Sequence, residues 1–112
     1  MADTPVLGEL EQLILLAILR LGADAYGLSV TRELESHAGR RLSRGALYTS
    51  LDRLETKGLV RWRNEVGGPE RQGIPKRVYT VTPRGLAAVR ASHRVLRRMW
   101  RGLEGVLKDN AS

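Results

Sequence analysis

Cysteine is absent from the 112 residues, and phenylalanine is absent as well. A chain without cysteine has no disulfide framework, no thiolate zinc site and no cysteine nucleophile. The absence is consistent with a reducing compartment. The length is typical of one domain, and a chain of this size buries enough surface to fold without a disulfide or a structural metal. Hydrophobic residues make up 42% of the sequence, which excludes a disordered composition.

Long hydrophobic runs are also missing. The longest apolar stretch is residues 13–19, whereas a helix that crosses a bilayer needs about 20 residues. The stretch from Met1 to Pro5 contains no basic side chain, so it does not have the pattern of a secretory signal. We therefore expect a soluble, cytoplasmic protein with no membrane partner.

The motifs of common catalytic sites are absent too. The sequence has no Gly-x-x-x-x-Gly-Lys-Ser/Thr loop, no Gly-x-Gly-x-x-Gly and no His-Glu-x-x-His. With only His37 and His93 as histidines, a metal site is not expected. We predict no enzymatic activity, no cofactor and no metal. A small basic nuclease is the least favoured alternative, because clustered carboxylates for Mg²⁺ are lacking.

Positive charge, in contrast, is abundant and unevenly distributed. The formal net charge is +7, and 16 of the 19 cationic side chains are arginine. Residues 1–39 carry a net charge of −4, residues 40–101 carry +12, and residues 102–112 carry −1. Arginine suits bidentate contacts to phosphate and guanine. The asymmetry favours a polyanionic partner, above all nucleic acid, and a solvated basic surface is the alternative.

Apolar spacing predicts three helices in the first half of the chain. Residues 7–21 are apolar on more than one face, which indicates packing on two sides. Residues 26–37 form a second predicted helix, and Ser43 is the expected N-cap of a third over residues 44–57. The side chains expected to face the core from the second and third helices are Leu28, Val30, Leu34, Ala46, Leu47, Leu51 and Leu54.

Two strands and a long helix are predicted in the second half. Residues 59–63 and 76–81 alternate as strands do. The glycines and prolines of residues 66–75 predict a hairpin loop between them. Thr82 is the expected N-cap of a last helix over about residues 83–107.

The element order of three helices, a β-hairpin and a final helix indicates a fold class. It is typical of an α+β, mainly α protein: a winged helix-turn-helix with a long C-terminal dimerisation helix. We assign residues 1–82 to the DNA-binding domain and residues 83–112 to the dimerisation helix and tail. An unrelated small α+β domain with the same element order is the alternative.

The third helix, about residues 43–57, is the predicted recognition helix, and residues 64–77 form the predicted wing. Helices that enter the major groove read bases near their N-terminus, where Arg44 is the candidate for a guanine contact. Gly45 allows either close approach to DNA or tight packing at the turn. Tyr48 is either a phosphate donor or a core aromatic. The full set of predicted DNA-binding residues is Ser43, Arg44, Gly45, Tyr48, Thr49, Arg53, Arg71, Gln72, Lys76 and Arg77.

Apolar residues of the last predicted helix recur at alternating spacings of three and four. This is the pattern of a heptad seam, and it predicts a homodimer, although one helix packing on its own domain has the same pattern. The first helix is the expected partner of this seam. Arginines that flank the seam are expected to stay solvated or to pair with Glu9 or Glu11 across the dimer. The predicted dimerisation residues are Leu10, Ile14, Leu86, Val89, His93, Leu96, Trp100, Leu103 and Leu107.

Three stretches of the sequence, residues 25–27, 45–60 and 76–85, carry a family resemblance. They read Ala-Tyr-Gly, Gly-Ala-Leu-Tyr-Thr-Ser-Leu-Asp-Arg-Leu-Glu-Thr-Lys-Gly-Leu-Val and Lys-Arg-Val-Tyr-Thr-Val-Thr-Pro-Arg-Gly. Together they resemble the PadR family of bacterial transcriptional regulators over about residues 8–105. The single helix after residue 82 resembles the short subgroup of that family.

The resemblance implies a homodimeric winged-helix repressor that binds a pseudo-palindromic operator in double-stranded DNA. It also implies a flat aromatic effector held by Trp100 and Leu96 at the dimer interface, and a Trp100 that only packs in the core is the alternative. One departure is that Ile74 stands where the family's wing often has a cation, which bears on how closely the wing approaches phosphate. A winged helix used only for protein contact, without DNA readout, is the alternative function.

Overall fold

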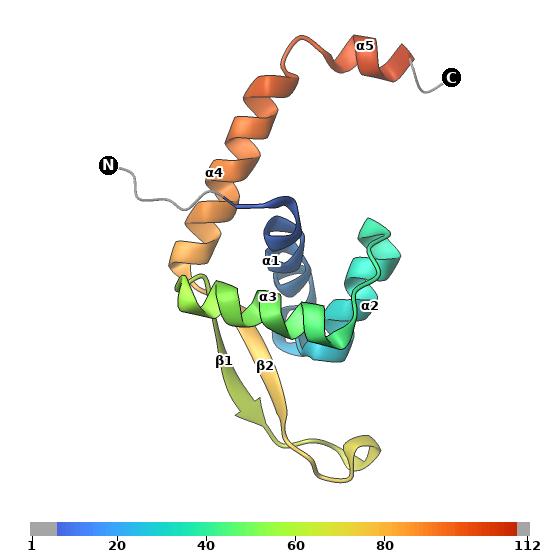
Figure 1. Ribbon diagram of the computed structural model, residues 1–112, viewed down its shortest axis with the longest axis vertical. Coiled ribbons are helices and arrows are strands. Elements are labelled where there is room, and N and C mark those ends of the chain that lie inside the picture. The colour runs from blue at the N-terminus through green and yellow to red at the C-terminus, as the bar shows by residue number, and fades with distance from the viewer. Residues whose placement is uncertain (1–6, 110–112) are drawn as a thin grey trace.

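The computed structural model describes residues 7–109. Residues 1–6 of the predicted DNA-binding domain and residues 110–112 of the predicted dimerisation segment lie outside the described residues. The chain folds as three helices, a β-hairpin and a long helix, as the sequence predicts (Figure 1). The elements in order are α1 (Glu9–Leu21), a 3₁₀ turn (Gly22–Asp24), α2 (Gly27–Ala38), α3 (Arg44–Thr56), β1 (Val60–Glu65), a second 3₁₀ turn (Pro69–Arg71), β2 (Lys76–Val81), α4 (Pro83–Trp100) and α5 (Glu104–Asp109).

Side-chain caps set the starts of α3 and α4 where the sequence places them. The Ser43 hydroxyl accepts a hydrogen bond from the Ala46 N–H at 3.1 Å, and Thr82 Oγ1 accepts one from the Gly85 N–H at 3.0 Å. Each bond satisfies one of the free N–H groups of a helix N-terminus. Pro83 follows the second cap at a position where its missing N–H costs nothing.

Helix α1 is the centre of the core, which explains its excess of apolar residues. Its contacts extend to α2, α3, α4 and β2. The neighbouring side chains Ile14, Leu15, Ala17 and Ile18 are all buried, so α1 packs on more than one side. Figure 1 shows α1 behind α3, with α2 and α4 on its two flanks.

The prediction of a core position is wrong for two residues. Leu28 is 51% exposed, because the first turn of α2 opens onto a groove rather than onto the core. Ala46 is exposed in the first turn of α3, and Ser50 takes the inward position on the next turn instead. The other expected inward side chains, Val30, Leu34, Leu47, Leu51 and Leu54, are buried.

One backbone hydrogen bond ties the hairpin to the helical part of the fold. Strands β1 and β2 pair antiparallel from Val60 opposite Val81 to Glu65 opposite Lys76. The Tyr79 N–H donates to the Ala25 carbonyl at 2.7 Å, which joins β2 to the segment before α2. The predicted hairpin loop contains the short 3₁₀ turn Pro69–Arg71.

The last predicted helix does not run to residue 107. Helix α4 ends at Trp100, and Gly102 adopts φ +87°, a left-handed conformation that favours glycine. The Leu103 N–H donates to the Trp100 carbonyl at 2.8 Å, and the Glu104 carboxylate accepts from the Gly102 N–H at 3.0 Å as α5 begins. The heptad spacing therefore does not continue through Leu103 and Leu107 along one helix.

No helix within residues 7–109 is both long enough and apolar enough to cross a bilayer.

Candidate nucleic-acid interface

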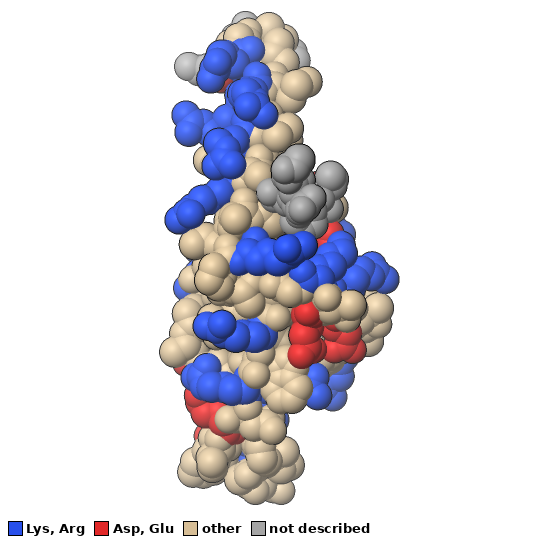
Figure 2. Space-filling view, turned by 90° about the vertical axis from the view of Figure 1, so that its left-hand side faces the viewer, with Lys and Arg blue, Asp and Glu red and all other residues tan. Residues whose placement is uncertain are grey.

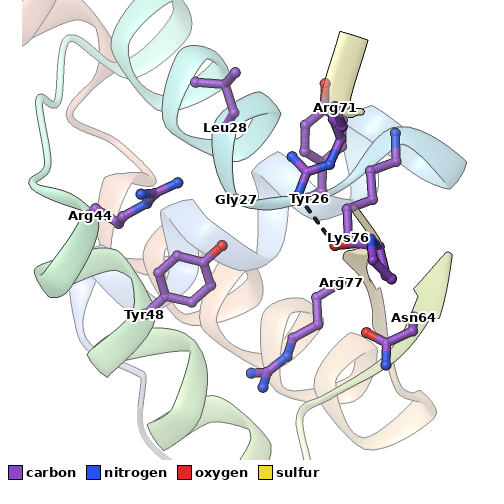
Figure 3. Close-up of a pocket in the computed structure, with 10 residues that line it drawn as sticks. Tyr26, Gly27, Leu28, Arg44, Tyr48, Asn64, Arg71, Lys76 and Arg77 are labelled. Carbon is purple, nitrogen blue, oxygen red and sulfur yellow. Dashed lines mark hydrogen bonds between the residues drawn. The ribbon is translucent and has the colours of Figure 1, made fainter. Parts of the chain in front are cut away.

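A cationic groove lies where the start of α3 faces the start of α2 and the wing. Its volume is about 480 Å³, and Figure 3 shows its lining. Four cationic side chains line it: Arg44 from α3, and Arg71, Lys76 and Arg77 from the wing. None of its lining residues is acidic. The arrangement therefore suits an anionic partner that contacts a helix and a hairpin at once.

Two of these cations are positioned by aromatic rings. Lys76 Nζ lies 4.2 Å from the centre of the Tyr26 ring, and the Arg77 guanidinium carbon lies 3.9 Å from the Trp62 ring. Such cation–π contacts hold a charged side chain without neutralising it. The two rings thus orient Lys76 and Arg77 while leaving their positive charge available to an anion.

A buried tyrosine lies next to Arg77 on the same strand. Burial raises the pKa of the Tyr79 hydroxyl above its ordinary value because it opposes the phenolate form, and this outweighs the lowering effect of Arg77. Tyr79 is therefore neutral at physiological pH. The positive charge of Arg77 in the groove is left uncompensated by this neighbour.

Tyr48 lies between the core and the groove. Its ring packs against the buried cluster, and its hydroxyl points at the first residue of α2 (Figure 3). A β-carbon built on Gly27 would lie 2.3 Å from Tyr48 Oη. The absence of a side chain at Gly27 thus makes the space that the Tyr48 hydroxyl occupies.

Gly45 is exposed on the outer face of α3. A β-carbon at this position would meet no atom within 4 Å, so packing inside the chain does not require glycine here. Glycine also lowers helix propensity. Of the two readings of Gly45, close approach of a partner is the one that this open space favours.

The wing loop is held by its own arginine. Arg71 Nε donates to the Ile74 carbonyl at 3.1 Å and its Nη2 to the Pro75 carbonyl at 3.3 Å, the second bond being the dashed line in Figure 3. Gln72 has a left-handed φ of 55° and is exposed. Ile74 is 58% exposed at the tip. Arg71 therefore has a structural task in addition to lining the groove.

The remaining predicted residues of α3 lie outside the groove. Ser43 uses its hydroxyl as the helix cap, Thr49 is exposed on the outer face, and Arg53 is exposed near the C-terminal end of the helix. In turn, the sequence reasoning missed five residues that line the groove. Tyr26, Gly27 and Leu28 lie at the start of α2. The Ala-Tyr-Gly sequence of residues 25–27 contributes to the family resemblance, but it does not indicate a binding site. The other two are Asn64 and Pro75.

The predicted dimerisation residues fall into two groups. Ile14 is fully buried within its own chain, while Leu10, Leu86 and Val89 are partly buried there, so Ile14 has no surface left for a partner. His93 is exposed, and Leu96, Trp100 and Leu103 are 47–49% exposed. Leu107 lies in α5, and its side chain is outside the description. On α1 the exposed apolar residues are Leu16 and Leu19.

Glu9 and Glu11 have partners within the chain. Arg40 Nη1 lies 2.7 Å from Glu9 Oε1, and Lys57 Nζ lies 2.6 Å from Glu11 Oε2. The flanking arginines of α4 form no ion pair with the side chains described for residues 7–106. The same residues contain no group of three or more His, Asp or Glu side chains that could hold a metal ion.

The chain matches known proteins along most of its length. The model of the Transcriptional regulator PadR-like family matches residues 15–91. The chain is 39% identical over 92 residues to Transcriptional regulator Rv3488 of Mycobacterium tuberculosis, covering 80% of this chain and 81% of that protein. It is also 34% identical to a 37.1 kDa transposon protein of Streptomyces fradiae, covering 90% of this chain but 27% of that protein.

Solved structures show the same fold. A PadR family transcriptional regulator from Eggerthella lenta superimposes with a TM-score of 0.65 at 27% identity, covering 88% of this chain and 86% of that one. Bacillus subtilis PadR, solved in complex with operator DNA, superimposes with a TM-score of 0.59 at 20% identity, covering 73% of this chain and 46% of that one. These matches confirm the winged-helix fold and exclude the nuclease alternative. The chain belongs to the PadR-like family and is a transcriptional regulator, not an enzyme.

Proposed function

We propose that the protein is a homodimeric repressor that binds a specific sequence in double-stranded DNA. One observation carries the proposal: four cations from α3 and the wing converge on one groove whose lining holds no carboxylate. A helix flanked by a hairpin is the shape that fits a major groove and its neighbouring backbone. The operator complex of Bacillus subtilis PadR supports duplex DNA as the partner.

The side chains have separate roles in this proposal. Arg44 extends from the first position of α3 and reads guanine, because its planar fork matches the two acceptors of that base. Lys76, Arg77 and the Tyr48 hydroxyl contact phosphates and fix the orientation of the helix. Gly45 lets the backbone of α3 approach the duplex.

A second copy of the chain completes the DNA-binding unit. Helix α4 carries exposed apolar side chains, Val95, Leu96, Met99 and Trp100, next to its buried face. We assign residues 83–112 to dimerisation and residues 1–82 to DNA binding. A two-fold dimer presents two α3 helices to successive major grooves about 34 Å apart, so the operator is a pseudo-palindrome.

Selection of bound sequences from a random duplex pool tests sequence readout directly. We expect enrichment of a pseudo-palindrome. Arg44→Ala is expected to cost about 1–3 kcal/mol at one base position and to relax the preference there. Arg32→Ala removes an exposed arginine of α2 outside the groove and serves as the control. Selection without enrichment contradicts the proposal and favours the protein-contact module.

We also propose that the exposed Trp100 and Leu96 take a flat aromatic effector at the dimer interface. Trp100 is 48% exposed at the end of α4, and two-fold symmetry brings its copy to the same interface. Planar cationic dyes are titrated into a Trp62→Tyr variant, whose only indole is Trp100. Saturable quenching supports the site, and unchanged fluorescence contradicts it.

A further inference from the structure

The most charged surface outside the groove is one face of α4. Arg90, Arg94, Arg97, Arg98 and Arg101 are spaced so that they share a face of the helix, and all five are exposed. We call this surface the α4 arginine face. Figure 2 shows Lys and Arg side chains in a column along the part of the molecule where α4 lies. Four of these residues, Arg94, Arg97, Arg98 and Arg101, enclose a depression of about 310 Å³.

The α4 arginine face gathers five cations that have no counter-charge among the described side chains. Arg20, Arg40, Arg41 and Arg63 each contact a glutamate at 2.5–2.9 Å. The five arginines of the α4 arginine face form no such pair with the side chains of residues 7–106, and α4 contains no acidic residue. Like charges three and four residues apart on a helix repel each other. This cluster is therefore destabilising until an external anion neutralises it.

Dimerisation leaves this surface open. With 100° between successive residues, the arginines lie on the side of α4 opposite Val95, Leu96 and Met99, which form its exposed apolar face. Covering the apolar face with a second copy thus leaves the arginines in solvent. Figure 1 places this half of α4 at the end of the molecule away from the wing.

We propose that the α4 arginine face binds the phosphate backbone of a second stretch of duplex DNA. Arginine forms bidentate contacts with phosphate, which favours nucleic acid over acidic protein side chains spread along a folded surface. From Arg90 to Arg101 the helix rises about 16 Å. Duplex DNA carries one charge per about 1.7 Å of its axis, so several phosphates lie within this length. Because the face is far from the wing, the two surfaces hold different DNA segments.

The salt dependence of binding to a random 20-bp duplex isolates this surface. We start from Arg44→Gln/Lys76→Gln, which removes two groove cations, and measure fluorescence anisotropy at several salt concentrations. Adding Arg94→Gln/Arg98→Gln is expected to lower the remaining affinity at least tenfold. It is also expected to reduce the slope of log K against log salt by about 2. The control adds Arg20→Gln/Arg32→Gln instead, which removes the same amount of positive charge from α1 and α2. It is expected to change the slope by less than half of the change that Arg94→Gln/Arg98→Gln causes.

A capture experiment tests the second segment. Protein bound to a bead-immobilised duplex is expected to retain a second, labelled duplex, and Arg94→Gln/Arg98→Gln is expected to lose the second duplex but keep the first. Equal capture by this variant and by Arg20→Gln/Arg32→Gln overturns the proposal. Polyglutamate and unlabelled duplex DNA are then compared, at equal charge concentration, as competitors of the second, labelled duplex. If polyglutamate displaces it as effectively as DNA does, the proposal is also overturned and the face is assigned to an acidic protein. Circular dichroism confirms that each variant is folded. Failure of the operator proposal can be distinguished from failure of this one. It appears in the selection experiment, where the wild-type protein would enrich no sequence.

Discussion

At the scale of single residues, glycines with different surroundings separate folding from binding. A β-carbon on Gly85 would lie 2.2 Å from the Leu59 carbonyl and 2.8 Å from Val81 Cγ1, so this glycine lets α4 pack on the strand. A β-carbon on Gly45 would meet nothing within 4 Å. The first glycine is required by the fold, whereas the second is not.

Gly45→Ala therefore has opposite expected effects on stability and on binding. Alanine favours the helix by about 1 kcal/mol over glycine, so denaturant unfolding should show a more stable protein. Operator affinity should fall, because the added methyl group faces the duplex. Gly85→Ala is the control and is expected to destabilise by about 1–3 kcal/mol through overpacking. A Gly45→Ala variant that binds operator as tightly as the wild type would show that close approach is not needed at this position.

The pair formed by Gly27 and Tyr48 gives a second residue-scale prediction. Gly27→Ala is expected to destabilise the wild-type protein by about 1–3 kcal/mol, because the methyl group collides with the Tyr48 hydroxyl. In a Tyr48→Ala background the collision is gone, and the same change should cost little. Chemical denaturation of the four proteins in this cycle measures the coupling. Additive costs would mean that the contact is relieved elsewhere.

At the scale of elements, one ion pair joins the central helix to the recognition helix. Lys57 follows the end of α3, and its Nζ lies 2.6 Å from Glu11 Oε2 on α1, while the Gly8 N–H donates to Glu11 Oε1 at 3.1 Å. Burial of Glu11 opposes its charge, but these two hydrogen bonds and the positive charges of Lys57 and Arg53 together outweigh burial. The pKa of Glu11 therefore lies below its ordinary value.

The direction of this pKa shift predicts a pH-dependent stability. A carboxylate whose pKa is lower in the folded state stabilises the protein above its ordinary pKa, and the contribution is lost as pH falls through the folded-state value. Glu11→Gln is expected to cost on the order of 1 kcal/mol at pH 7. The difference in unfolding free energy between this variant and the wild type should shrink below about pH 4.5, the ordinary pKa of a glutamate. Glu9→Gln, in a pair whose glutamate side chain is 81% exposed, is the control with little expected effect. Equal differences at pH 7 and pH 3 would contradict this role for the pair.

Local signals in the sequence predict the elements well and the site less completely. Ser43 and Thr82 are N-cap residues, and the residues around them complete the sequence pattern of a helix N-terminus. The starts of α3 and α4 are therefore predictable. The end of α4 is not, because the spacing of apolar residues continues past Gly102, whose left-handed backbone breaks the helix. The groove includes Tyr26 because tertiary packing brings the start of α2 beside the wing, and it includes Asn64 because strand pairing places this residue opposite Arg77. No periodicity along the chain records these contacts.

At the scale of the whole molecule, α4 presents two opposite faces with different chemistry. Its arginines lie on one side, and Val95, Leu96 and Met99 expose apolar surface on the other. Burying apolar surface of this kind stabilises association by roughly 25 cal/mol per Å². The dimer we propose therefore depends on the apolar face and not on the arginines.

Leu96→Glu tests this dependence. A charge placed in the centre of the apolar face is expected to shift the protein to a monomer in analytical ultracentrifugation, because the carboxylate would be buried without a partner. Ala87→Glu, on the exposed opposite side of α4, is the matched control and should remain a dimer. The monomer keeps its groove but loses the second half-site. Its affinity for the selected pseudo-palindrome should then fall by about two to four orders of magnitude, since linked sites gain that much from effective concentration. Affinity for a single half-site should change little. A Leu96→Glu protein that remains dimeric, or a monomer that binds the full operator as tightly as the wild type, would contradict the assignment of α4 to dimerisation.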